Sequence, residues 1–386
     1  MNNIIKSRFQ NKNIRNAITS TIENIGKFNE TNVIMFDTHD FEFPLEIINK
    51  GAQQVTIVEG SKKYHRWQVN SLDKWKLNNN AIEDKNFLNT DRNFPSIILA
   101  SKCVLNANVE EIFNTTKRGK QNSETFVEQI LQYNSNDYIQ KYPDKAHEVK
   151  KDEKIAYSKN SVIITATNTT RSHKHFINYL MNEAGTYYSN KESSLLSPKT
   201  KLSLITFITP ELYYELFLVK NNLMSPSKTI IKNSLFFNTF FNLKDIGSFK
   251  CDEIYPKMIL PEYKATTLSK LEDNSIDPSL MKGILIQPKS RNELGYDQKH
   301  IDEIFIVKLH FLLSKIVNIR KRDTFEGVFK SMFTSYPGDI NLSSKFWSIP
   351  LNEILKLLPK LFNEEFTQEM KEEFENFQIS YKKLQK

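Results

Sequence analysis

Three polar residues occupy chain positions at which a nucleotide-binding fold of alternating strands and helices places its ligand contacts. Asp37 ends the apolar segment 32–37, and Glu59 ends a second apolar segment, 54–59. An acid that ends the second strand of a βαβ unit can accept hydrogen bonds from ribose hydroxyls. Asn168 follows a later apolar segment, at another strand end where ligands bind in such folds, although a polar strand-to-helix turn with Thr as N-cap would have the same pattern. The spacing therefore predicts the remains of a site for a nucleoside cofactor and its substrate.

The turn after the first of these segments lacks the glycines that such a cofactor requires. Glycines there let backbone N–H groups and a helix N-terminus approach the nucleotide. The chain instead has Thr38-His39-Asp40-Phe41-Glu42-Phe43-Pro44, in which every residue carries a side chain. We therefore expect a βαβ opening whose cofactor site is filled, with Asp37 and Glu59 as vestigial contacts.

Alternating apolar and helical segments predict the elements that position these residues. After the opening pair, strands are expected at 95–100, 161–166, 201–208 and 283–287, with helical stretches between most of them. This alternation favours an α/β fold with a mainly parallel sheet.

The same pattern predicts two domains. Residues 1–290 are expected to form a Rossmann-like domain with a polar insertion at about 114–160. No strand pattern follows Pro288, so residues 291–386 are expected to form a small all-helical domain with a tail. Its first helix is indicated by an apolar stripe at helical spacing, formed by Phe305, Leu309, Leu312, Ile316 and Ile319.

Composition narrows the class of partner. The chain has 386 residues, a net charge of +8 and a pI near 9, which favours a polyanion such as nucleic acid or an anionic membrane, although solubility alone could explain the charge. No apolar run approaches the roughly 20 residues of a membrane helix, so we expect a soluble protein. Cys103 and Cys251 match no metal or redox spacing and are expected to be reduced thiols of an intracellular protein.

The N-terminal segment combines cations with isoleucines at helical spacing and has no acid before Glu23. It resembles a mitochondrial import signal, although an ordinary first helix of the domain would have the same pattern. The cations are Lys6, Arg8, Lys12 and Arg15, and the isoleucines are Ile14, Ile18 and Ile22.

Three basic segments are candidates for contact with nucleic acid at the junction of the two domains. The segment 62–67 interleaves cations with Tyr64 and Trp67, which could stack on bases or simply anchor a helix to the sheet. A basic turn around Lys174 lacks the further ligands of a metal site, and the run 320–322 fits either a helix cap or a backbone-binding patch. The candidate cations are Lys62, Lys63, Arg66, Lys174, Arg320, Lys321 and Arg322.

Taken in order, these segments resemble the rRNA adenine dimethyltransferase superfamily and, within it, the fungal branch of mitochondrial transcription factor B. The resemblance implies an S-adenosylmethionine-dependent methyltransferase fold with a small helical C-terminal domain. It is carried by the segments 33–43, 54–59, 161–170, 202–210, 258–261, 283–288 and 319–325.

Departures from the superfamily pattern separate its branches. Active dimethyltransferases have a glycine loop and an Asn-Leu-Pro-Tyr-type tetrad that holds the target adenine, and of these only Asn168 is present. The resemblance therefore implies no bound cofactor and no catalytic residue. It implies instead a mitochondrial matrix factor that partners the single-subunit mitochondrial RNA polymerase in promoter recognition and melting and binds the single-stranded non-template strand.

Two alternatives stay open. One is an rRNA adenine N6-dimethyltransferase acting on mitochondrial small-subunit rRNA, with S-adenosylmethionine at Glu59 and a flipped adenine at Asn168. The other is a catalytically silent mitoribosomal or assembly protein that uses the same basic surface.

Overall fold

The computed structural model divides into two compact units, which we describe separately. The first comprises Met1–Leu180, Ser193–Pro210 and Lys244–Gln287, and the second Met181–Glu192, Glu211–Leu243 and Pro288–Lys386. The second unit thus includes residues 211–243, which precede the domain boundary expected near residue 290. The residues that the structure describes are 9, 11–36, 38, 42–52, 54–58, 97–99, 160–166, 180, 184, 202–221, 227–254, 280–297, 301, 304–320, 323–335, 345 and 348–385.

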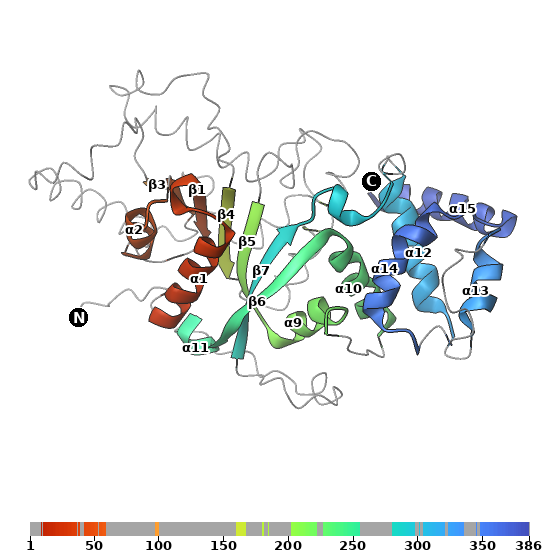
Figure 1. The fold of residues 1–386 in the computed structure, drawn as a ribbon, viewed down its shortest axis with the longest axis horizontal. Helices are drawn as coiled ribbons and strands as arrows, with labels where there is room; N and C mark the ends of the chain where they lie inside the picture. The colour runs from red at the N-terminus through yellow and green to blue at the C-terminus, as the bar shows by residue number, and fades with distance from the viewer. Residues whose placement is uncertain are drawn as a thin grey trace, which may run out of the picture. The chain divides into compact units, whose positions relative to one another are not determined.

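A seven-stranded sheet in the order β3-β2-β1-β4-β5-β7-β6 forms the centre of the first unit (Figure 1). The strands from β3 to β5 are parallel, whereas β7 pairs with β5 in antiparallel fashion. The mainly parallel sheet expected from the sequence is confirmed. The strands are β1 (Thr31–Phe36), β2 (Gln54–Val58), β3 (Ile97–Leu99), β4 (Asn160–Ala166), β5 (Leu202–Ile208), β6 (Phe241–Lys250) and β7 (Leu280–Pro288).

Two helices contribute to the apolar core on one face of this sheet. They are α1 (Lys12–Ile25), which begins where Asn11 Oδ1 accepts a hydrogen bond from the Asn13 N–H at 2.7 Å, and α2 (Glu42–Asn49). Alternate strand residues point to one face, so Val33 and Met35 of β1 join this core. The expected isoleucine stripe of α1 is buried in it, so that segment is a helix of the domain, while a role in import stays a prediction. The fully buried helix residues are Ile14, Ile18, Ile22, Phe43 and Ile47.

The start of α2 corrects one sequence-based expectation. Glu42, Phe43 and Pro44 were assigned to the turn after the first strand, but they form the first turn of α2. Proline is tolerated there because the first helical N–H groups have no partner within the helix. The connection between β1 and α2 therefore comprises residues 37–41, fewer than the seven residues of the expected turn, 38–44.

The sequence analysis missed β6, a strand at the edge of the sheet. Its residues alternate between buried and exposed at both ends, 241–244 and 248–250, but Asp245 and Gly247 interrupt the apolar pattern between them. Gly247 has φ +136, which glycine adopts readily, and its N–H donates to Asp245 Oδ1 at 2.8 Å. Polar and irregular residues are usual in edge strands because they discourage pairing with other chains.

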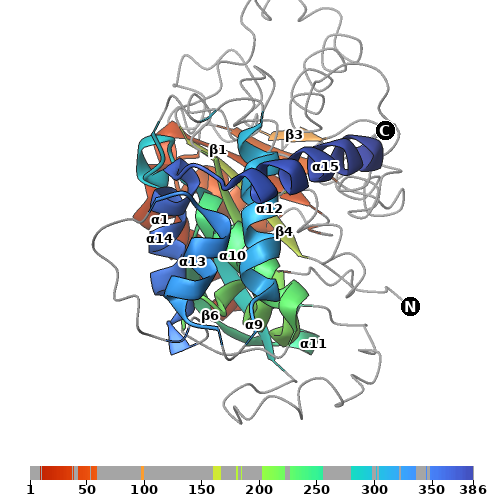
Figure 2. The same ribbon diagram turned by 90° about the vertical axis from the view of Figure 1, so that its right-hand side faces the viewer.

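The second unit is helical. Beyond Pro288 the described residues form helices and isolated bridges but no further strand, so the expected helical C-terminal region is confirmed (Figure 2). Ser227 caps α10, and Thr324 caps α13 by accepting the Gly327 N–H at 3.2 Å. The helices are α9 (Pro210–Phe217), α10 (Lys228–Phe240), α12 (Phe305–Asn318), α13 (Phe325–Met332), α14 (Leu351–Asn363) and α15 (Gln368–Gln385); the short α11 (Cys251–Ile254) belongs to the first unit.

Aromatic rings form much of the core of the second unit. Phe305 of α12 meets Phe240 of α10 edge to face at 6.2 Å and packs on Phe362 of α14 at 4.9 Å between centroids. The ring centre of Phe311, also on α12, lies 5.2 Å from that of Phe374 on α15. Helix α12 therefore joins α10, α14 and α15 into one packed body.

Candidate functional site

Of the site residues predicted from the sequence, Arg320 alone is among the described residues. It is exposed and follows the last turn of α12. The roles of the others stay predictions, because they lie outside the described residues: Asp37, Glu59, Lys62, Lys63, Arg66, Asn168, Lys174, Lys321 and Arg322.

The structure does describe the helix end that would face a cofactor. In doubly wound sheets, ligands bind outside the carboxyl ends of the strands, at the point where the strand order reverses. That point lies between β1 and β4 here, because β2 and β3 extend the sheet to one side of β1 and β4 extends it to the other. β1 ends at Phe36 and α2 begins at Glu42. The first turn of α2 is thus the counterpart of a nucleotide-binding helix end.

An aromatic row passes through this helix end. Phe43 is fully buried, and its ring lies 5.8 Å from that of Phe9. Phe9 in turn lies 6.0 Å from Phe207 of β5, and Phe207 meets Phe249 of β6 edge to face at 5.4 Å. Such pairs contribute roughly 0.5–1.5 kcal/mol each beyond the burial of their area. The row therefore ties the first turn of α2 to two strands of the sheet.

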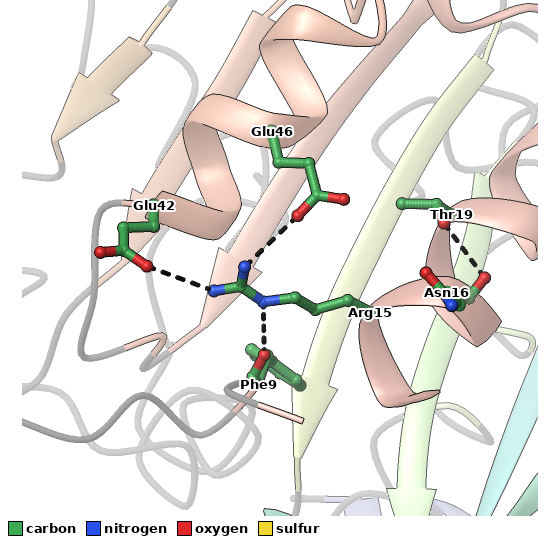
Figure 3. Close-up of polar contacts among 6 residues, drawn as sticks. All are labelled: Phe9, Arg15, Asn16, Thr19, Glu42 and Glu46. Atoms are coloured by element: carbon green, nitrogen blue, oxygen red, sulfur yellow. Dashed lines mark hydrogen bonds and ion pairs between the residues drawn. The ribbon is translucent and has the colours of Figure 1, made fainter. Parts of the chain in front are cut away.

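Arg15 of α1 completes the arrangement, as Figure 3 shows. Its Nε donates to the Phe9 carbonyl oxygen at 2.8 Å, and Nη1 lies 3.4 Å from Glu46 Oε2. Nη2 lies 3.9 Å from Glu42 Oε2, and the guanidinium carbon lies 5.2 Å from the centre of the Phe43 ring. A planar guanidinium suits this combination of carbonyl, carboxylate and ring. We call Phe9, Arg15, Glu42, Phe43 and Glu46 the Arg15 cluster.

The Arg15 cluster has little capacity to bind an anionic ligand. Glu46 and Glu42 lie on either side of the Arg15 charge, which is therefore compensated within the protein. Glu42 also sits in the first turn of α2, where the helix dipole stabilises a negative charge. An anionic ligand group approaching this helix end would be repelled by that carboxylate.

Sequence reasoning did not identify the members of this cluster as a unit. Arg15 was counted among the cations of an import signal, and Phe9 and Glu46 were not singled out. The available signal was helical spacing, since Arg15 lies three residues before Ile18 of the apolar stripe and therefore next to it on the helix. Its partners on α2 could not be inferred, because Glu46 is 31 residues away along the chain.

The described residues include neither a metal site nor a membrane-spanning helix. No group of three or more His, Cys, Asp and Glu residues in the described part of the chain could hold a metal ion. Among the described helices, none has the length and apolar character needed to cross a membrane.

The strand order defines the class of fold. A sheet in the order β3-β2-β1-β4-β5-β7-β6 with an antiparallel β7 is that of the Rossmann-like S-adenosylmethionine-dependent methyltransferases. Among solved structures, the chain is similar to the one described as "Crystal structure of 23S rRNA methyltransferase ErmE". The sequence identity is 8% and the TM-score 0.37, over 89% of this chain and 98% of that chain. No protein-family model matches the sequence, and no curated protein does.

Proposed function

We propose that this chain is a degenerate member of the rRNA adenine dimethyltransferase superfamily that acts in mitochondrial transcription initiation. It partners the single-subunit mitochondrial RNA polymerase in the matrix, takes part in promoter recognition and melting, and holds the released non-template strand. The observation that carries this proposal is the Arg15 cluster, which occupies the end of α2 with the protein's own side chains.

A methyltransferase-type sheet can serve in nucleic-acid binding without its cofactor. Phe43 is fully buried and Arg15 is paired with Glu42 and Glu46, so these side chains of the helix end already have partners within the protein. A basic protein of this fold keeps the capacity to bind a polyanion. Stacking on a released base is worth roughly 1–3 kcal/mol, and opening a base-pair step costs about 1.4 kcal/mol, so binding of single strands can favour melting.

Transcription in vitro with the cognate polymerase tests the proposal. The protein should be required on a linear duplex promoter and largely dispensable when the start region is already mismatched, because the template then needs no melting. Equal dependence on the protein with both templates would contradict a melting role. Withdrawing a methyl donor should change nothing.

The fold class supports the second candidate, an rRNA adenine N6-dimethyltransferase. That enzyme would need S-adenosylmethionine, which the proposal expects to bind weakly or not at all beside the Arg15 cluster. Isothermal calorimetry separates the two candidates. Micromolar binding that S-adenosylhomocysteine competes away would favour the enzyme and refute the proposal of a cofactor-free protein.

A further inference from the structure

Two helices of the second unit come from segments of the chain that contain no acidic residue. Residues 216–244 include α10, and residues 304–322 include α12. The structure packs these two helices against each other. Figures 1 and 2 both show them side by side. The cations of the two segments are Lys220, Lys228, Lys232 and Lys244 in the first, and Lys308, Lys315, Arg320, Lys321 and Arg322 in the second.

Two lysines of α10 reach across to neutral side chains of α12. Lys232 Nζ donates to Ser314 Oγ at 2.7 Å, and Lys228 Nζ donates to Asn318 Oδ1 at 3.1 Å. The two lysines are four residues apart, so they lie on one face of α10 with a rise of about 6 Å between them. Exposed Arg320 follows shortly after Asn318. We call these five residues the α10–α12 row.

The three cations of the row are not paired with acids among the described residues. No carboxylate forms an ion pair with Lys228, Lys232 or Arg320 in the part of the chain that the structure describes. Asp323, which is close in sequence to Arg320, accepts the Arg320 backbone N–H at 2.9 Å. Four other lysines of this unit are paired with acids: Lys315 with Glu373, Lys330 with Glu326, Lys356 with Glu353, and Lys371 with Glu365. Lys220 and Lys308 instead donate to the backbone carbonyl oxygens of Leu243 and Phe362.

Three uncharged rings, those of His310, Phe236 and Tyr381, lie next to the row. His310, one turn before Ser314 on α12, stacks on Phe236 with 4.4 Å between ring centres. Burial and the positive charge of Lys232 together lower the pKa of His310 to about 3, so the ring is neutral at physiological pH. The ring centre of Tyr381, on α15, lies 5.5 Å from that of His310. The uncompensated positive charge of the row therefore lies beside neutral rings, of which that of Tyr381 is partly exposed.

We propose that the α10–α12 row binds the phosphate backbone of a single-stranded nucleic acid, with Tyr381 facing its bases. This inference rests on the proposed function and names a face that would hold the released strand. Lysine and arginine are the usual donors to phosphate oxygens, and the rise between Lys228 and Lys232 resembles the spacing of neighbouring phosphates. Because Ser314 and Asn318 are neutral, phosphates can approach these cations without displacing an acid.

The test measures binding of a fluorescent oligodeoxythymidine to the full chain at several salt concentrations. For single strands, the logarithm of the affinity falls with the logarithm of salt with a slope of about −0.7 for each phosphate contact. The double variant Lys228→Gln/Lys232→Gln should therefore lose about 1.4 from the slope. The control Lys356→Gln/Lys371→Gln removes the same charge from lysines that are already paired, and it should keep the wild-type slope.

A second variant leaves both lysines in place. Asn318→Asp is nearly isosteric at an exposed position, and it would give Lys228 a carboxylate partner. The slope should fall by about 0.7, whereas Asn376→Asp on the exposed face of α15 should leave it unchanged. Thermal melting of each variant establishes that it is folded.

The outcomes separate this inference from the proposed function. Equal losses of slope in the row and control variants would overturn the inference, because net charge alone would then explain binding. Unchanged slopes in the row variants would also overturn it, and if the same variants lost the polymerase the row would be a contact for an acidic protein surface. In both cases the proposed function would stand as long as the wild-type chain bound the oligonucleotide and opened promoters. Failure of the wild type to bind single strands would refute both.

Discussion

Arg15 in the first unit and Lys232 in the second are both partly buried cations on helices, but their partners differ in charge. Arg15 lies close to two carboxylates, those of Glu42 and Glu46. Lys232 donates to the hydroxyl of Ser314, and burial lowers its pKa because water no longer solvates the ammonium group fully.

The difference shows that the partner of a cation, more than its presence, decides what it can bind. The charge of Arg15 is balanced nearby, so its main effect is to join α1 to α2. The charge of Lys232 is not balanced, so its field extends to whatever approaches α12. A net charge of +8 cannot distinguish these two cases.

Removing the ring of Phe43 should have the largest effect. Phe43→Ala should lower the free energy of unfolding by about 3–5 kcal/mol, because it leaves a cavity beside Phe9 in a fully buried row. Denaturant unfolding of the full chain measures this change. Ile379→Ala, at an exposed position of α15, should stay within about 0.5 kcal/mol of wild type. A small effect of Phe43→Ala would mean that the aromatic row does not stabilise α2.

Removing the guanidinium of Arg15 should have the next largest effect. Arg15→Met should cost about 1.5–3 kcal/mol of stability, the usual value for a hydrogen bond to a charged group, because the Phe9 carbonyl and two carboxylates lose their partner. The salt dependence of oligonucleotide binding should not change. Lys12→Gln, an exposed substitution on the same helix, is the control. A reduced slope for Arg15→Met would show that its charge is available to a polyanion after all.

His310 should make the stability of the protein depend on pH. Its pKa is lowered to about 3 in the folded state, so the unfolded chain binds more protons between about pH 6.5 and pH 3. This contribution is therefore complete above pH 6.5 and is lost as the pH falls, by about 2 kcal/mol between pH 7 and pH 5. Unfolding of wild type and His310→Gln across this range isolates the histidine. Parallel pH profiles would show that His310 is solvated.

The smallest effect on stability is expected at Lys228. Lys228→Gln should change the free energy of unfolding by less than about 0.5 kcal/mol, because its bond to Asn318 is exposed. The same variant should still reduce the salt dependence of binding. A large loss of stability would instead make the α10–α12 row a structural contact like that of Arg15.

The central strands were predictable because their burial leaves a strong pattern. β1, β4 and β5 lie inside the sheet, where strands form nearly continuous apolar runs. Each end of these three strands lies within one residue of the position expected from the sequence. β6 lies at the edge of the sheet, where it has a neighbouring strand on one side and polar residues are tolerated. It therefore left no comparable signal.

The candidate site was predictable only in part. The segment after the first strand lacks glycine and contains Phe43. Both features lie in one short stretch of the chain, so the sequence alone indicated an altered helix end. The approach of Phe9 and Arg15 to that end depends on how α1 packs beside α2. No local pattern encodes that packing, because apolar stripes specify which face is buried but not which helix covers it.

The sequence by itself determined the periodicities, the βαβ opening without glycine, the helical C-terminal region and the absence of acids from the segments of α10 and α12. Only the tertiary structure decided which charges are compensated. Arg15 meets Glu46 across 31 residues of chain, Lys232 meets Ser314 across 82, and Lys228 meets Asn318 across 90. Partners this far apart are brought together by the packing of apolar faces, and hydrogen bonds then form between whichever polar groups that packing leaves adjacent.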